Sequence, residues 1–207
     1  MLCTAFFPQE ECKESALTLM KQVPGWCSEE KASSMMDLIF SYQPEVCVEI
    51  GVFAGASLLP TACSLKCLGK GLVYAIDPWD KDECVKIYPE NDANKQWWEN
   101  IDMDQVHANF VDLVDFYQLN EQCIILKETS EQAASKIGDI DILHIDGNHQ
   151  DESALIDVNL YVPKVKKGGY VWFDGWATAP KAFDALKKSC RFKKFVNRGQ
   201  CILVEKK

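Results

Sequence analysis

Two acidic residues and a histidine follow apolar runs in the second half of the chain. Asp146 and His149 come after the run 140–145, and Asp174 directly follows the run 170–173. If these runs form neighbouring parallel strands, their carboxyl ends bring the three side chains around one cleft. Two carboxylates with water suit Mg²⁺, and an imidazole, which titrates near neutral pH, can accept a proton. The sequence therefore predicts acid–base chemistry here, with Asp146 and Asp174 as metal ligands.

Four residues in the first half of the chain are suited to binding a nucleoside. The run 46–50 contains Glu49 and leads directly into Gly51, with Gly55 further on, and a second apolar run ends at Asp77. At this edge of a doubly wound sheet, glycine lets the backbone approach a ligand and an acidic side chain can accept hydrogen bonds from ribose. A plain tight turn and a loop-capping Asp77 are the alternatives. The glycine spacing matches neither the dinucleotide fingerprint nor a phosphate loop, which disfavours a nicotinamide dehydrogenase.

Short apolar runs alternate with longer helical stretches, and the chain has no internal repeat. Because these runs lack polar alternation, we expect parallel strands covered by helices on both faces. Two helices, 8–22 and 28–42, are expected before the first strand, and Pro8 suits a first helical turn. A hairpin of 192–196 and 201–205 should add one reversed strand. The predicted parallel strands are 46–50, 72–76, 123–126, 140–145 and 170–173.

Four motifs together resemble one family. They are EIGVFAG at 49–55, YAIDPW at 74–79, IDGNH at 145–149 and GGYVWFD at 168–174. This combination resembles class I S-adenosylmethionine-dependent methyltransferases, in particular small O-methyltransferases related to the sugar-modifying enzymes of macrolide biosynthesis. The resemblance covers roughly residues 44–205. It implies an α/β, Rossmann-like fold with a seven-stranded, mostly parallel sheet, one reversed C-terminal strand and helices on both faces.

The resemblance also implies roles for the residues of the glycine turn and its neighbours. Glu49, Gly51 and Gly55 would line the methionine part of S-adenosylmethionine, and Asp77 would hold its ribose. Asp146 would contact the cofactor as well as the metal.

The segment that contains Thr129 and Ser130 resembles the family's adenine-side loop. The alternative is a helix start, because either hydroxyl can cap a helix that begins near Glu131.

The resemblance implies that His149 is the general base and that Asp146 and Asp174 bind Mg²⁺. Metal-dependent relatives often carry a second acidic or amide residue beside the strand-end aspartate, whereas here the neighbours of Asp174 are Phe173 and Gly175. The alternative is that Asp174 accepts backbone hydrogen bonds in a turn.

Other candidate side chains are sorted by their surroundings. His144 lies inside an apolar strand, which favours a buried, hydrogen-bonded histidine over a ligand. Trp79 and Trp176 adjoin the proposed site and are the best candidates to wall an acceptor pocket, since aromatic faces stack on flat or sugar-like molecules. We expect most other aromatic residues between the second and third strands to pack in the core.

These observations predict an S-adenosylmethionine-dependent O-methyltransferase for a small hydroxylated acceptor, assisted by Mg²⁺. The alternatives are a cofactor-binding protein without catalysis and a nucleic-acid methyltransferase. The net charge of -9 argues against nucleic acid as a partner, since it disfavours binding to a phosphate backbone. The segment 164–207 is nevertheless basic, with 12 Lys and Arg against 3 Asp and Glu.

The composition also bears on organisation and location. Ten cysteines without a Cys-x-x-Cys pair indicate reduced thiols and a cytoplasmic protein. We expect no signal peptide, because residues 1–7 lack a basic leader, and no membrane span, because no apolar run reaches 18 residues. We expect a single domain, with an N-terminal helical layer at 1–43 and a methyltransferase core at 44–207. A homodimer contact could involve the N-terminal helices or the basic segment.

Overall fold

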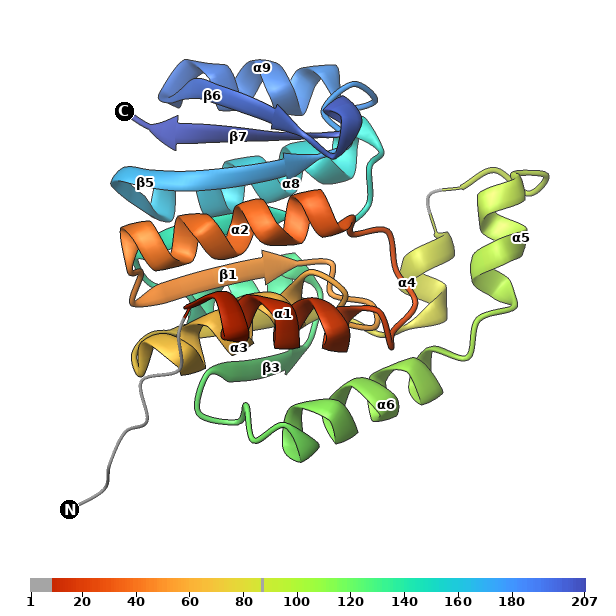
Figure 1. Ribbon diagram of the computed structural model, residues 1–207. Helices are drawn as coiled ribbons and strands as arrows, with labels where there is room; N and C mark the ends of the chain where they lie inside the picture. Colours follow the sequence, from red (N-terminus) through yellow and green to blue (C-terminus); the bar gives the residue numbers. More distant parts are fainter. Residues whose placement is uncertain (1–8, 87) are drawn as a thin grey trace.

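A seven-stranded sheet forms the centre of the protein, which a computed structural model describes over residues 9–86 and 88–207. The strand order is β3-β2-β1-β4-β5-β7-β6, and β7 runs antiparallel to both of its neighbours (Figure 1). The predicted sheet with one reversed C-terminal strand is therefore confirmed. The strands are β1 (Val46–Ile50), β2 (Leu72–Asp77), β3 (Cys123–Lys127), β4 (Ile140–Ile145), β5 (Val165–Asp174), β6 (Cys190–Val196) and β7 (Cys201–Lys206).

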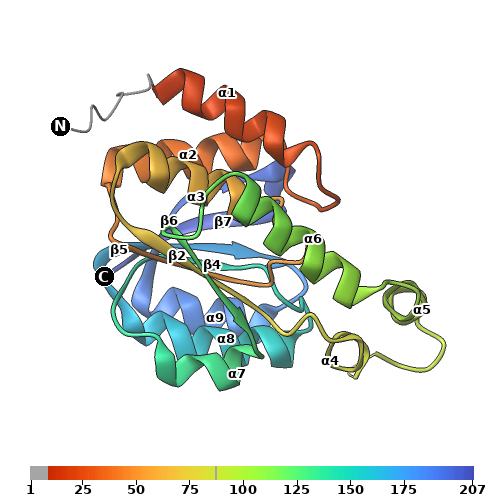
Figure 2. The same cartoon turned by 90° about the horizontal axis from the view of Figure 1, so that it is seen from below.

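Helices cover both faces of the sheet, as Figure 2 shows. One face carries α1 (Gln9–Met20), α2 (Glu29–Tyr42), α3 (Leu58–Leu68) and α6 (Met103–Phe116), and the other carries α7 (Ser130–Ala133), α8 (Asp151–Tyr161) and α9 (Pro180–Ser189). Two short helices, α4 (Lys81–Val85) and α5 (Ala93–Glu99), lie beyond the end of the sheet. Short 3₁₀ turns are formed by Ala134–Lys136, Val162–Lys164 and Asn197–Gly199.

The two N-terminal helices form a layer that packs on α3. Helix α2 begins after Ser28, whose side chain accepts a hydrogen bond from the Lys31 N–H. Such a cap satisfies one of the backbone donors that every helix start leaves unpaired. The helix predicted at 8–22 is α1, while Pro8 itself lies outside the described residues.

Successive side chains of a strand point to opposite faces of the sheet, so a largely apolar strand contributes apolar side chains to the core on both faces. In β1, for example, Cys47 belongs to the core under α2, α3 and α6, whereas Val48 belongs to the core under α7, α8 and α9. Strand β5 begins at Val165, earlier than the predicted start at residue 170. Val165 already pairs with Ile140 of β4, and regular pairing continues from Tyr170 after a shift in register.

Two general expectations can be compared with the described residues. No disulfide links the described cysteines. Among the helices of residues 9–86 and 88–207, none combines the length and the apolar character that crossing a membrane would require.

Candidate active site

The parallel pairing of β4 with β5 brings the predicted polar residues to one edge of the sheet. His144 pairs with Trp172 and Ile145 with Phe173, so the residues that follow, Asp146 and Asp174, lie at adjacent strand ends. His149 is nearby, since its Nε2 lies 3.2 Å from Asp146 Oδ1. The convergence expected for Asp146, His149 and Asp174 is therefore present in the structure.

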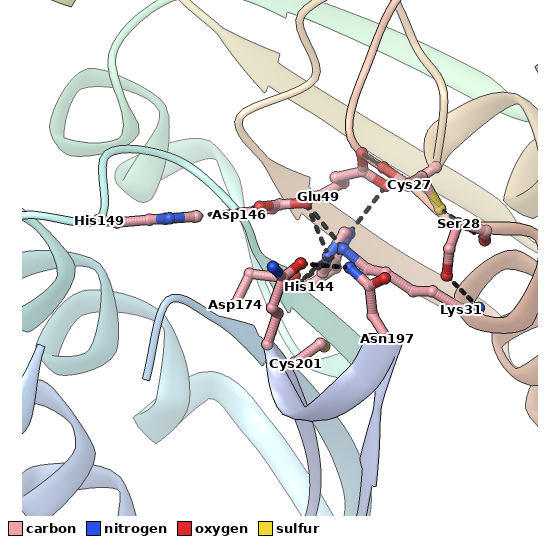
Figure 3. A network of polar contacts seen from close by, with 12 residues as sticks. Cys27, Ser28, Lys31, Glu49, His144, Asp146, His149, Asp174, Asn197 and Cys201 are labelled. Carbon is pink, nitrogen blue, oxygen red and sulfur yellow. Dashed lines mark hydrogen bonds and ion pairs between the residues drawn. The ribbon is translucent and has the colours of Figure 1, made fainter. Parts of the chain in front are cut away.

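A lysine from the N-terminal layer occupies the space between the two carboxylates. Lys31 Nζ lies 2.8 Å from Asp146 Oδ2 and 2.7 Å from Asp174 Oδ2 (Figure 3). The lysine side chain is only 1% exposed. Because a buried charge is tolerated only when it is paired, these two ion pairs hold α2 against the ends of β4 and β5.

His144 extends this network into the interior. Its Nε2 lies 3.0 Å from Asp174 Oδ2, and its Nδ1 lies 3.2 Å from Glu49 Oε2. Glu49 also accepts a hydrogen bond of 2.6 Å from Ser57 Oγ. As predicted, His144 is a buried histidine held by polar partners. Glu49 is buried too, and its two carboxylate oxygens contact Ser57 and His144.

The charges of this network set the pKa values of its members. Burial and the Lys31 charge act to lower the pKa of His144, but Glu49 and Asp174 outweigh them and raise it to about 9. Burial would raise the pKa of Asp146, yet Lys31 and the two histidines hold it well below its usual range. Near neutral pH the network thus contains two buried cations, Lys31 and His144, and the ionised carboxylate of Asp146.

The site does not fit Mg²⁺ as its residues lie. His144, Asp146 and Asp174 offer ligand atoms within 4.8 Å of one another, which is close enough for a metal ion. However, the carboxylate oxygens that would bind the ion are turned toward Lys31 Nζ. Mg²⁺ requires oxygen ligands at about 2.0–2.1 Å in octahedral geometry, and an ammonium in their midst both fills that volume and repels the ion.

His149 differs from His144 in being accessible. Its side chain is 49% exposed, and the hydrogen bond to Asp146 raises its pKa above the ordinary value. Strand β5 ends at Asp174, so the backbone of Gly175, the next residue, packs against the His149 ring.

The glycine turn after β1 is held by Asp77. Its Oδ2 accepts hydrogen bonds from the N–H groups of Val52 and Phe53, and its Oδ1 accepts one from Trp79. Burial raises the pKa of Asp77, while these backbone donors act to lower it. Both readings of Asp77 stay compatible with the geometry, because a carboxylate has about four acceptor positions and three are used.

The two glycines of the turn have close neighbours. A Cβ at Gly51 would lie 2.3 Å from the carbonyl oxygen of Asp146, and one at Gly55 would lie 2.7 Å from the Phe110 ring. Both residues have positive φ angles, which favour glycine. Gly51 thereby lets the turn after β1 contact the turn after β4.

The segment after β3 begins a helix. Thr129 is the N-cap of α7, and its side chain and that of Gln132 form a reciprocal capping box. The carbonyl oxygen of Ser130 accepts a 2.6 Å hydrogen bond from the Tyr161 hydroxyl. The helix-start alternative is therefore confirmed, and the adenine-side role of both residues stays a prediction.

The aromatic residues expected to wall an acceptor pocket are only partly placed to do so. Trp79 is 1% exposed and stacks on Phe110, so the residue belongs to the core. It also borders a hollow with Asp80 and Met103, and its role as a pocket wall stays a prediction. Trp176 is half-buried against Phe183 and Phe195.

A different set of aromatic residues gathers beside the glycine turn. We call Trp26, Phe53, Trp97 and Trp98 the aromatic cluster, and its ring centroids lie 4.8–6.3 Å apart. Trp26 is 65% exposed and Trp97 43% exposed. Burial raises the pKa of Tyr88, while Trp98 of the cluster and Asn148, the residue before His149, act to lower it, so Tyr88 lies between the cluster and the candidate active site.

Sequence reasoning missed Lys31 and Trp26. Lys31 follows two acidic residues at a helix start, which is typical of a solvent-exposed first turn. Its spacing from the core residues of the same helix nevertheless indicated burial. Lys31, Met35 and Ile39 are four residues apart, and the latter two are core residues. A lysine in line with a buried helical stripe must find a partner in the interior.

The amino-acid sequence is similar to those of known proteins. A family described as methyltransferase domain matches residues 48–176. The curated "Uncharacterized protein R132" of Acanthamoeba polyphaga mimivirus is 32% identical over 146 residues, which cover 68% of this chain and 57% of that protein. The chain thus spans less than two thirds of the length of this relative.

Solved structures with a similar fold include two O-methyltransferases. The enzyme from Bacillus cereus, solved in complex with SAH, has 11% sequence identity and a TM-score of 0.64, and the match covers 98% of this chain and 94% of that one. The O-methyltransferase NovP has 19% identity and a TM-score of 0.64, with coverage of 84% and 77%. Since the family match spans more than half of the chain, the protein belongs to the methyltransferase domain family, with the class I fold that its motifs predicted.

Proposed function

We propose that the chain transfers a methyl group from S-adenosylmethionine to a hydroxyl of a small acceptor, with His149 as general base. The observation that carries this proposal is the half-exposed His149 imidazole, held by Asp146 at the edge of the sheet that also carries the glycine turn. The family match and the SAH bound to a structural neighbour support the choice of reaction and cofactor.

S-adenosylmethionine fits the donors and acceptors near Asp77. The backbone N–H of Glu128 donates to the Asp77 carbonyl oxygen, so the two residues are neighbours. Glu128 Oε2 is buried and has no hydrogen-bond partner among the described residues. A buried acceptor without a donor is unfavourable, and the ribose hydroxyls or adenine amino group would supply one.

The remaining cofactor contacts follow from position along the sheet edge. Ribose would take the fourth acceptor position of Asp77. The adenine side is assigned to the start of α7, and the methionine side to the ends of β1 and β4. These assignments comprise Thr129 and Ser130 for adenine, and Glu49, Gly51, Gly55 and Asp146 for methionine. When bound, S-adenosylmethionine supplies a methyl group activated on a sulfonium.

The reaction then needs a base and an aligned acceptor. With the Nε2 proton donated to Asp146, the lone pair of His149 lies on Nδ1. Nδ1 would take the proton of the acceptor hydroxyl as that oxygen receives the methyl group. Asp146 stabilises the imidazolium that forms, so the base stays in place through the transfer.

The aromatic cluster suggests the class of acceptor. Trp26 and Trp97 are exposed beside the glycine turn, and Tyr88 lies close enough to Trp98 and Asn148 for both to act on its pKa. Aromatic faces bind flat rings by stacking, so a hydroxyl carried on a planar ring, as in a phenol, fits this surface best.

Calorimetry and a methyl-transfer assay together test the proposal. We expect S-adenosylmethionine to bind, and at least one phenol in a panel of phenols and sugars to be methylated by the wild type but not by His149→Ala. Cofactor binding without transfer to any acceptor would instead favour the non-catalytic alternative. Absence of cofactor binding would overturn the proposal, and binding of RNA or DNA would favour the nucleic-acid alternative.

A further inference from the structure

The ion pairs of Lys31 join segments that are far apart in the sequence. Lys31 is separated from Asp146 by 115 residues and from Asp174 by 143 residues. In Figure 3 the lysine side chain reaches from α2 into the centre of the network, where Asp174 and His144 meet. The N-terminal layer therefore contributes a charged group directly to the candidate active site.

The Lys31 ammonium has the position and the contacts of a bound cation. It contacts one oxygen of each carboxylate at 2.7–2.8 Å, the usual distance for a charge-assisted hydrogen bond. The same two residues and His144 offer ligand atoms within 4.8 Å of one another, and His144 Nε2 lies 3.0 Å from Asp174 Oδ2 and 3.4 Å from Asp146 Oδ2. One site thus has two mutually exclusive occupants, a divalent ion or an ammonium.

Two further features match an ammonium rather than a metal. His144 Nε2 lies 3.0 Å from Asp174 Oδ2 and 3.4 Å from Asp146 Oδ2, so a second nitrogen shares the two oxygens that Lys31 contacts. Gly175 offers no side chain as a further ligand, and the His149 ring fills the space beside it. Among the described residues, the group that could hold a metal ion is therefore His144, Asp146 and Asp174, without a third carboxylate that would favour a doubly charged ion over a singly charged one.

Lys31 also determines where the proposed base lies. Asp146 contacts Lys31 through Oδ2 and His149 through Oδ1, so the carboxylate is fixed from both sides. Rotation of Asp146 would break both contacts at once. A change at Lys31 is thus transmitted to His149 through a single carboxylate.

We propose that Lys31 takes the place of a divalent cation, so that methyl transfer by this chain is independent of metal and Lys31 acts as the positioning residue for Asp146 and His149. The activity part of this inference rests on the proposed function. The metal-binding part does not, because it concerns the carboxylates alone.

The wild type supplies the first test. After treatment with EDTA and dialysis, we expect methyl transfer to be unchanged, and added Mg²⁺ or Mn²⁺ to have no effect. Calorimetry and electron paramagnetic resonance should detect no Mn²⁺ bound at this site. Loss of transfer in EDTA with recovery on adding Mg²⁺ would overturn the inference, as would Mn²⁺ binding that is abolished by Asp174→Asn.

Substitution of Lys31 supplies the second test. Lys31→Met removes the ammonium and leaves the carboxylates, so we expect this variant to gain a Mn²⁺ site, and Mn²⁺ to raise its melting temperature. The gain should be absent in Lys31→Arg, in Lys31→Met combined with Asp174→Asn, and in the control Lys21→Met, whose lysine is exposed on the same layer. A folded Lys31→Met that binds no Mn²⁺ would contradict the inference.

The two tests separate the possible failures. If no acceptor is methylated, the Mn²⁺ measurements still decide whether Lys31 replaces a metal. If Lys31→Met does not fold, the metal independence and Mn²⁺ binding of the wild type decide. In active protein, Lys31→Met should lower kcat/KM by roughly 10²-fold through misplacement of His149, with partial rescue in Lys31→Arg.

Discussion

His149 and Gly175 are in such close contact that no side chain can be added at position 175 without moving the histidine. A Cβ at Gly175 would lie 2.5 Å from His149 Cγ and 2.8 Å from its Nδ1. Gly175 also has a φ angle of +64°, which favours glycine. Because any side chain at position 175 would overlap the imidazole, glycine at this position is what lets His149, the proposed base, lie where it does.

Gly175→Ala should therefore lower activity while leaving cofactor binding intact. The added methyl group displaces the imidazole, and a shift of about 1 Å in a reacting group can lower kcat by roughly 10²-fold. Kinetics with the best acceptor measures the effect. Gly138→Ala is the matched control, since a Cβ there meets no atom within 4 Å. Equal activity of the two variants would contradict the proposed role of His149.

The pH dependence of methyl transfer should follow His149. Its hydrogen bond to Asp146 raises its pKa, so the imidazole stays protonated to a higher pH than an ordinary histidine. Because a general base must be neutral, kcat/KM should rise with pH and level off above this raised pKa. His149→Ala should lose roughly 10²- to 10⁴-fold in rate together with this rising limb. A pH profile that keeps its shape in His149→Ala would assign the base elsewhere.

Asp77→Ala should reduce both stability and cofactor affinity. Three backbone N–H groups of the glycine turn and the following loop lose their acceptor, and each buried donor left unpaired costs about 1–3 kcal/mol. We expect a loss of about 3 kcal/mol in unfolding free energy, measured by urea denaturation. Calorimetry should show weaker S-adenosylmethionine binding. The exposed Asp184→Ala serves as control, and unchanged affinity in folded Asp77→Ala would exclude Asp77 from the cofactor site.

Trp97→Ala should affect the acceptor more than the cofactor. Trp97 contributes an exposed ring to the aromatic cluster, and a stacked ring is worth about 0.5–1.5 kcal/mol. The KM for a phenolic acceptor should rise by roughly three- to tenfold, with little change for S-adenosylmethionine. Phe116→Ala, which removes a ring of α6 that is 78% exposed, against 43% for Trp97, should leave both KM values unchanged.

The parallel strands could be predicted from the sequence because they are largely apolar runs, and β1, β2, β4 and β5 end at or just before a glycine or an acidic residue. The same pattern located Asp146, His149 and Asp174, since parallel neighbours end at the same edge. Strand starts were less certain. The first residues of β5 include Lys166 and Gly168, which no apolar pattern marks as a strand.

The presence of the Lys31 ammonium between Asp146 and Asp174 could not be predicted, because it depends on contacts between residues more than 100 positions apart in the sequence. Nothing local distinguishes Lys31 from a solvated lysine except its alignment with Met35 and Ile39 on α2. Its partners become apparent only when α2 is placed over the ends of β4 and β5. The buried state of Trp79 likewise depends on α6, which supplies Phe110.

The burial of Lys31 also couples the order of folding to the completion of the candidate active site. During synthesis α2 emerges long before Asp174, and an unpaired ammonium remains hydrated because its burial alone is strongly unfavourable. Helix α2 can therefore take its final position only after β4 and β5 have delivered their carboxylates. Docking of the N-terminal helices and assembly of the charge network are then one cooperative event, and a chain that fails in one fails in the other.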